Sequence, residues 1–161
     1  MNMTLEERGR LVEAMRAAAI KNAEYLAKLA HEETGYGRVE DKTKKNILTA
    51  QKTPGIEDLQ TEAFSGDDGL TLVESAPYGV IGSITPSTNP TSTVVNNSMS
   101  MIAAGNAVVF NPHPAAKRCS QEAMRLMNEA IIEAGGPANL VVAAKEPNLE
   151  SSNKIMSHPD I

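Results

Sequence analysis

Two short loops carry the side chains of this chain that are best suited to bind a ligand. The first reads Thr-Pro-Ser-Thr-Asn-Pro at residues 85–90, and the second reads Asn-Pro-His-Pro at residues 111–114. Each loop follows an apolar run and precedes a helical pattern, which places it at the carboxyl end of a strand and beside a helix N-terminus. Free amides at such an N-terminus attract phosphate. The pair predicts a site for a phosphate-bearing ligand, although neither loop has the glycine spacing of the dinucleotide fingerprint or of a Walker loop.

Few residues could supply nucleophilic or metal chemistry. Cys119 is the only cysteine, and it shares a helical stripe with Ala123 and Leu126. A thiol on an apolar stripe is expected to be buried and structural, because a reactive thiol needs exposure and a lowered pKa. The histidines lie too far apart in the sequence for metal-ligand spacing, so no metal site is predicted. These histidines are His31, His113 and His158.

Three apolar runs without polar alternation are expected to be parallel strands that are covered on both faces. They span residues 80–85, 107–110 and 140–143, and a helical pattern separates each run from the next. Helical crossovers between parallel strands give right-handed βαβ units. A further helix is expected over residues 146–157. The sequence therefore predicts an α/β fold with a three-layer, Rossmann-like parallel half-sheet.

The helices have recognisable starts and ends. A capping-box pattern occurs at residues 4–7, and Gly35 closes a second helix. A third helix is expected over residues 39–51, and its lysine cluster is interpreted as a solvated face. Thr91 or Ser92 is expected to cap the helix that follows the first loop. The lysine cluster consists of Lys42, Lys44 and Lys45.

The helical first part and the strand-rich second part are expected to be distinct units. Residues 1–69 are interpreted as an N-terminal helical segment that packs on the sheet, and residues 70–161 as a partial Rossmann-like domain. Within the join, a loop or turn at residues 65–69 precedes an extended segment at residues 70–75.

Composition restricts the class of protein. The 161 residues carry a formal net charge of −5, which argues against a nucleic-acid partner because phosphate backbones need a basic surface. Three tyrosines, two phenylalanines and no tryptophan leave few stacking platforms for single strands. No apolar run has transmembrane length, and the N-terminus lacks the pattern of a secretory signal. A single cysteine fits a reducing compartment, so the sequence predicts a cytoplasmic protein that does not bind membranes.

The two loops and their flanks resemble the aldehyde dehydrogenase superfamily. The likeness is strongest to the CoA-acylating branch, the propionaldehyde and acetaldehyde dehydrogenases of bacterial microcompartments. It covers nearly the whole chain, and a Pro-Ser-Thr-Asn-Pro followed by an Asn-Pro-His-Pro is a specific combination. The matching stretches lie at residues 33–35, 77–82, 85–90, 103–106, 111–114 and 158–161.

This resemblance implies an NAD-dependent oxidoreductase that converts a small aldehyde and CoA, as co-substrate, to acyl-CoA and NADH. In that family a cysteine attacks the aldehyde, hydride passes to NAD, and CoA takes the acyl group from the thioester. The nucleophile belongs to a catalytic domain expected after Ile161, so the chain is expected to be the NAD-binding part and inactive alone. Two alternatives stay open. One is a non-catalytic nucleotide-binding or assembly module, and the other is a truncated piece without independent function.

The resemblance also implies a catalytic role in the first loop. An asparagine amide in this loop of the family helps to hold the developing oxyanion, which is a large term in acyl chemistry. Asn89 is the candidate here, although a gap-free match puts the family position on Thr88. The alternative is that Asn89 caps or shapes the turn before Pro90.

Cofactor contacts are implied in both loops. In the second loop, Asn111 and Pro114 stand where most relatives carry a lysine and a glutamate that contact the adenosine ribose, so ribose contacts must be made differently. His113 could stack on or bond to the cofactor, or lie in solvent. The sequence does not decide between NAD and NADP or give the chain length of the aldehyde. The resemblance is compatible with a homo-oligomer and with a location in the lumen of a bacterial microcompartment. The implied cofactor-binding residues are Ile84, Thr85, Pro86, Ser87, Asn111, His113 and Pro114.

Overall fold

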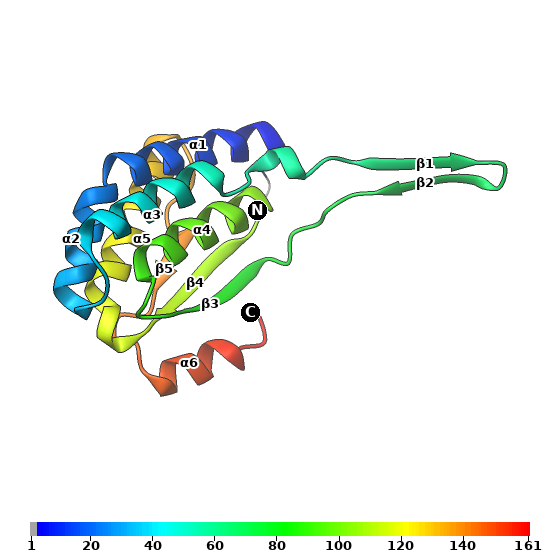
Figure 1. Ribbon diagram of the computed structural model, residues 1–161. Helices are drawn as coiled ribbons and strands as arrows, with labels where there is room; N and C mark the ends of the chain where they lie inside the picture. The colour runs from blue at the N-terminus through cyan, green and yellow to red at the C-terminus, as the bar shows by residue number, and fades with distance from the viewer. Residues whose placement is uncertain (1–2) are drawn as a thin grey trace.

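A three-stranded parallel sheet carries the two loops (Figure 1). The computed structural model describes residues 3–161. The strands are β3 (Val80–Thr85), β4 (Ala107–Pro112) and β5 (Val141–Ala143), in the order β3-β4-β5. The predicted parallel half-sheet is thus confirmed. β4 runs to Pro112 instead of ending at Phe110, because its last residues stay in register with β3 as far as Thr85.

Helices cover both faces of the sheet and give the three predicted layers. The two crossover helices lie on one face, and the helix that follows the last strand lies on the opposite face (Figure 1). These are α4 (Pro90–Ala103), α5 (Lys117–Glu133), which follows the short 3-10 turn η2 (Pro114–Ala116), and α6 (Leu149–Met156). The buried stripes of α4 and α5 include Val95, Met99, Ala123 and Ile131, at the spacing of an amphipathic helix. No helix within residues 3–161 is long and apolar enough to cross a bilayer.

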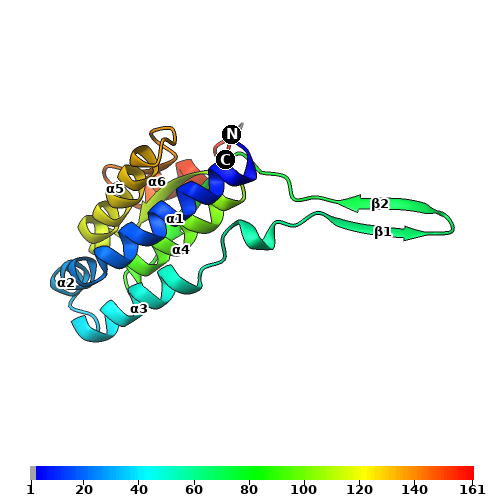
Figure 2. The ribbon, with the colours of Figure 1, turned by 90° about the horizontal axis from the view of Figure 1, so that it is seen from above.

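The N-terminal helices form an outer layer (Figure 2). They are α1 (Leu5–Lys21), α2 (Ala23–Thr34) and α3 (Val39–Lys52), followed by the short 3-10 helix η1 (Ile56–Asp58). They pack mainly on α4 and α5 rather than on the strands. One apolar cluster joins the two parts and includes Leu11 of α1, Met99 of α4 and Ile131 of α5. The division into residues 1–69 and 70–161 stays a prediction.

Side chains of α1 close the ends of neighbouring helices. The capping box predicted at residues 4–7 is present at the start of α1. Arg8 donates to the carbonyl of Ala103 at 2.6 Å, and Arg16 donates to the carbonyl of Thr53 at 3.2 Å. The last carbonyls of a helix have no donor within it. α1 therefore completes the C-termini of α4 and α3 and fixes both helices against itself.

A β-hairpin, here called the arm, projects from the helical body (Figure 1). It pairs β1 (Glu62–Gly66) with β2 (Gly69–Val73) in antiparallel register. The sequence predicts the extended segment and a turn before it, although only residues 67–68 of the expected 65–69 lie between the strands. It misses β1, because Glu, Ala and Gly are depleted in strands. Every residue of both strands is exposed. Pairing within the arm, and not burial, defines these strands.

Candidate functional site

The two loops lie side by side at the carboxyl end of the sheet. Thr85 pairs with Pro112 in the β3–β4 register, and the amide of His113 donates to the carbonyl of Thr85 at 3.0 Å. The crossover helices change faces after β5 (Figure 1). In open α/β sheets, ligands bind beyond the carboxyl ends of the strands, close to the point where the winding changes sides. The expectation that both loops share one end of the sheet is confirmed.

The end of β3 contains a buried hydroxyl without a partner. Side chains alternate along the strand, and the hydroxyl of Ser83 accepts a hydrogen bond from Asn97 of α4 at 3.0 Å. Thr85 lies on the same face and is 2% exposed, and its Oγ1 has no hydrogen-bond partner within residues 3–161. Ile84 faces the other way and is exposed, as is Pro86, whereas Ser87 is half-buried. A buried hydroxyl without a partner lowers the stability of the fold.

Asn89 occupies the N-cap position of α4, which begins at Pro90. The expected caps, Thr91 and Ser92, are therefore wrong, because proline favours the first helical position and fixes the start of the helix there. The hydroxyl of Thr91 donates instead to Oδ1 of Asn46 in α3, at 3.0 Å. The side chain of Asn89 makes no capping bond. Its Oδ1 accepts from Nζ of Lys45 at 2.6 Å.

Two lysines of α3 contact the first loop, which sequence reasoning missed. Lys42 donates to the carbonyl of Thr88 at 3.2 Å, in addition to the bond from Lys45 to Asn89. Burial lowers the pKa of the Lys42 ammonium. The interpretation of the cluster as a solvated face fits Lys44 and Lys45, which are exposed, whereas Lys42 is half-buried. It missed the hydrogen bonds from Lys42 and Lys45 to the first loop. The three-residue spacing puts Lys42 and Lys45 on one face of the helix, but the sequence does not indicate what that face meets.

The second loop holds α6 in place. Asn111 is 2% exposed. Its Oδ1 accepts from the hydroxyl of Ser151 at 2.6 Å, and its Nδ2 donates to the hydroxyl of Ser152 at 2.7 Å. His113 is exposed, and its Nδ1 accepts from the amide of Ala115 at 3.1 Å. The side chain of Asn111 is thus fully engaged at the start of α6, while the ring of His113 remains accessible. Their implied contacts with a ribose stay predictions.

A carboxylate already occupies the N-terminus of α5. The two oxygens of Glu33 in α2 accept from the amides of Arg118 and Cys119, at 2.8 and 2.7 Å. The expectation of free amides after the second loop is therefore wrong, because an acidic side chain satisfies them and complements the helix dipole. Glu33 belongs to the Glu-Thr-Gly stretch at residues 33–35. Within the sequence, only this motif indicated that Glu33 could have a special role. In contrast to α5, α4 has within residues 3–161 no side chain bound to the amides of its N-terminus.

The Cys119 thiol is buried, as predicted. It is 0% exposed, and its Sγ lies 3.4 Å from the carbonyl of Ala116. Burial, together with the nearby Glu33, raises the pKa of this thiol to about 12. A protonated, inaccessible thiol is not a nucleophile.

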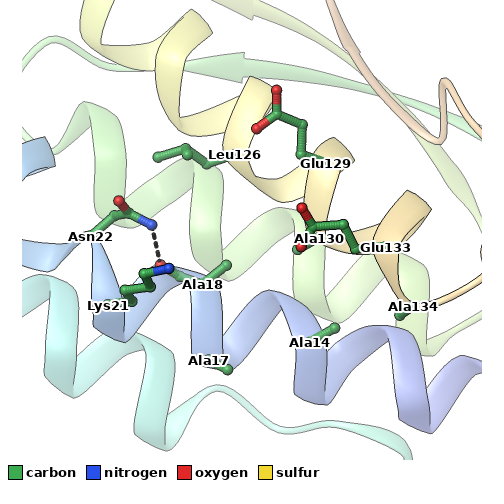
Figure 3. A pocket seen from close by; sticks show the side chains of 10 residues that line it. All are labelled: Ala14, Ala17, Ala18, Lys21, Asn22, Leu126, Glu129, Ala130, Glu133 and Ala134. Atoms are coloured by element: carbon green, nitrogen blue, oxygen red, sulfur yellow. Dashed lines mark hydrogen bonds between the residues drawn. The ribbon is translucent and has the colours of Figure 1, made fainter.

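A wider hollow lies between α1 and α5, away from both loops (Figure 3). It measures ≈ 520 Å³, and half of the residues that line it are alanines. Lys21, Glu129 and Glu133 stand at its rim. No residue of either loop lines it, so it is not part of the candidate site. Asn89 lines two smaller hollows. One lies between the first loop, α3 and α4, and the other lies between the first loop, α3 and the residues just before α3.

Comparison with known proteins places this geometry in a family. The model of the aldehyde dehydrogenase family matches residues 1–161, the full length of the sequence. The chain belongs to the aldehyde dehydrogenase family. The family resemblance of the two loops is thus confirmed.

Similar proteins include CoA-acylating members of this family. An acetylating acetaldehyde dehydrogenase of Bilophila wadsworthia is 57% identical over 158 residues, which are 98% of this chain and 33% of the relative. The structure of a propionaldehyde dehydrogenase from a fucose-utilisation microcompartment of Clostridium phytofermentans is 52% identical, with a TM-score of 0.96 over 99% of this chain and 37% of the other. An engineered glycolyl-CoA reductase with bound NADP⁺ is 48% identical, with a TM-score of 0.96 over the same 99% and 37%. The chain spans about a third of the length of these relatives.

Proposed function

We propose that this chain is the cofactor-binding part of a CoA-acylating aldehyde dehydrogenase. The whole enzyme would catalyse R–CHO + CoA–SH + NAD⁺ → R–CO–S–CoA + NADH + H⁺. The names of the relatives, which refer to acetaldehyde and propionaldehyde, support a short aldehyde as substrate. The observation that carries the proposal is the β3–β4 register, which brings the two family loops together at the carboxyl end of the sheet.

The first loop fits a nucleotide cofactor. When bound, the nicotinamide ring accepts the hydride that leaves the aldehyde carbon. Thr85 offers a buried hydroxyl that lacks a partner among residues 3–161, and α4 begins without a side-chain cap, so its first amides suit an anionic group. We assign the cofactor to this loop, with Ile84, Pro86 and Ser87 beside Thr85.

The second loop would contact the cofactor less directly. Asn111 fixes α6 through both ends of its amide, so it shapes the site rather than donating to a ribose. The exposed ring of His113 can stack or donate from Nε2, because its Nδ1 acts as an acceptor. Pro114 is exposed and offers an apolar contact. Glu33 already holds the amides of α5. We therefore propose that a pyrophosphate group would bind at α4.

The hydroxyl of Thr85 gives a sharp test of this assignment. Thr85→Val keeps the side-chain volume and removes a hydroxyl that is unsatisfied in the free protein. We expect the free energy of unfolding to rise by about 1 kcal/mol. NAD affinity should fall about fivefold, the equivalent of one lost hydrogen bond. Urea denaturation and titration calorimetry with NAD measure the two effects.

Ser98 provides the matched control for Thr85. It is 0% exposed within α4, and its hydroxyl also lacks a partner in the part of the chain that the structure describes. Ser98→Ala should also raise the free energy of unfolding, but it should leave NAD affinity unchanged. Absence of NAD binding by the wild type would contradict the cofactor proposal itself. Equal affinity of wild type and Thr85→Val would contradict only the role of Thr85.

The 161-residue chain is proposed to be inactive alone because Cys119 is its only thiol. We expect native protein to react with Ellman's reagent at pH 8 at least about a hundredfold more slowly than urea-unfolded protein, since the folded thiol stays protonated. The pKa of this thiol is about 12 in the folded chain and about 8.5 when the thiol is free. The folded state therefore favours the protonated thiol, and this contribution to stability is complete below about pH 8.5. This contribution is lost as the pH rises toward 12. NADH formation from propanal and CoA by the purified chain would contradict inactivity.

Its setting is proposed from the relatives. A cytoplasmic location, with association in the lumen of a bacterial microcompartment, is supported by the microcompartment origin of the propionaldehyde dehydrogenase structure. Residues 1–69 are assigned as a helical segment and residues 70–161 as the NAD-binding unit, because both loops and the whole parallel sheet fall in the second range.

A role in assembly is favoured by the arm. Its strands have open edges, and exposed strand edges recruit further strands. Leu70 and Leu72 lie on one face of the arm and are 65% and 60% exposed. Such apolar side chains on a projecting hairpin are typical of a surface that becomes covered. The arm is therefore assigned to contact a second copy of the chain, which gives a homo-oligomer.

The double variant Leu70→Lys/Leu72→Lys tests this assembly. Two cations on the face of the arm that carries Leu70 and Leu72 should disfavour its burial, because desolvating charge is costly. We expect the wild type to elute as an oligomer and the variant as a monomer in size-exclusion chromatography with light scattering. Thr71→Lys, on the opposite face of the same strand, should leave the oligomer intact. A monomeric wild type would contradict the assignment.

A further inference from the structure

We propose that Lys45 is a positioning residue for Asn89. It holds the carboxamide oxygen so that the Nδ2 hydrogens are left to donate to a ligand. This inference rests on the proposed function and on the role that the family resemblance implies for Asn89, the donation of a hydrogen bond to the developing oxyanion. It assigns a role to a lysine outside both loops, on a helix that precedes them in the chain.

Donor chemistry fixes the orientation of the Asn89 side chain. A lysine ammonium has three donors and no acceptor, so the atom that meets Lys45 must be Oδ1 and not Nδ2. The distance of 2.6 Å between Nζ and Oδ1 is short, as expected for a hydrogen bond from a charged donor. Nδ2 of Asn89 donates no hydrogen bond within residues 3–161. Its two donors are therefore unused in the protein.

The alternative use of this side chain is blocked by the same contact. An asparagine at the N-cap normally turns its oxygen to the amides of the second and third helical residues, here Thr91 and Ser92. Asn89 makes no such bond. The oxygen instead points to Lys45, on α3. The lysine thus diverts the side chain from an ordinary structural role.

α3 holds the backbone as well as the side chain. Lys42 donates to the carbonyl of Thr88, and Asn46 accepts from the hydroxyl of Thr91. With Lys45, these residues occupy one face of α3 at helical spacing. Three hydrogen bonds thus fix the residues on either side of Pro90. The ammonium on Oδ1 also polarises the carboxamide and strengthens its N–H donors.

Nuclear magnetic resonance of the 161-residue chain tests the proposal. Lys45→Met keeps the length of the side chain and removes the donor. We expect the ¹³Cγ resonance of Asn89 to move upfield, and hydrogen exchange at the Ser92 amide to slow several-fold as Asn89 turns to cap α4. Lys45→Arg should keep the wild-type values, because a guanidinium also donates. Lys44→Met, on a different face of α3, is the matched control.

A titration with NAD distinguishes this inference from the proposed function. Addition of NAD should shift the amide resonances of the first loop in the wild type and in Lys45→Met alike, because the cofactor is assigned to Thr85 and its neighbours and not to Asn89. An unchanged Cγ resonance and unchanged Ser92 exchange in Lys45→Met would overturn the positioning role, whatever the NAD result. Absence of any NAD-induced shift in the wild type would overturn the proposed function, and the Cγ comparison would still decide the role of Lys45.

Discussion

Replacing Phe110 by alanine is expected to lower the free energy of unfolding by about 3–5 kcal/mol. Phe110 lies in the central strand β4, is 0% exposed, and belongs to the apolar cluster that contains Met99 of α4 and Met127 of α5. Truncation leaves a cavity between the sheet and these helices that the surrounding side chains fill only in part. Because a domain is stabilised by only about 5–15 kcal/mol, the loss is large. Urea denaturation measures it.

The chain offers a matched control, since it has two phenylalanines. Phe64 lies on the arm and is 58% exposed. Phe64→Ala removes the same atoms from a solvent-exposed site, and we expect a change within about 0.5 kcal/mol at concentrations too low for self-association. Equal losses for the two variants would mean that the cluster around Phe110 does not form the core of the fold.

Replacing Gly82 by valine is expected to detach α6 from the sheet. A Cβ at Gly82 would lie 2.6 Å from Cγ2 of Ile155 and 3.0 Å from Cγ2 of Ile161. Both are branch methyls with little freedom to move, so valine cannot be accommodated without displacing the helix. We expect a loss of about 1–3 kcal/mol and at least about tenfold faster hydrogen exchange in α6.

Gly66 is the control for this substitution. It also lies in a strand, but nothing approaches the position of its Cβ within 4 Å. Gly66→Val should leave exchange in α6 unchanged. Hydrogen exchange read by mass spectrometry compares α6 with α5 in each variant. Protection of α6 equal to the wild type in Gly82→Val would show that the close approach at Gly82 does not hold the helix.

These two predictions address the two faces of the sheet that carries the site. Phe110 secures the face covered by α4 and α5, and Gly82 permits the approach of α6 to the other. Asn111 joins the second loop to α6 through Ser151 and Ser152. Loss of α6 should therefore loosen the second loop, while loss of the Phe110 core should unfold both loops together.

Local pattern was enough to predict the parallel sheet and the common position of the loops. Continuous apolar runs separated by helical periods indicate parallel strands, and parallel connection forces all carboxyl ends to one edge. The residues 85–90 and 111–114 therefore had to meet there. The capping box at residues 4–7 and the buried Cys119 follow from spacing within one or two helical turns, which the sequence displays directly. The family resemblance of the loops likewise required only contiguous residues.

The partners of the polar side chains at the site were decided by the tertiary structure. Lys45 meets Asn89 across 44 positions of sequence, and Glu33 meets the amide of Cys119 across 86. Asn111 reaches Ser152 across 41. Periodicity assigns a side chain to a face of its own element, but the element opposite that face is chosen by how the helices pack. The interpretation of the lysine cluster missed its contacts with the first loop, and the expectation of a free helix end was wrong, because such packing contacts are absent from any local pattern.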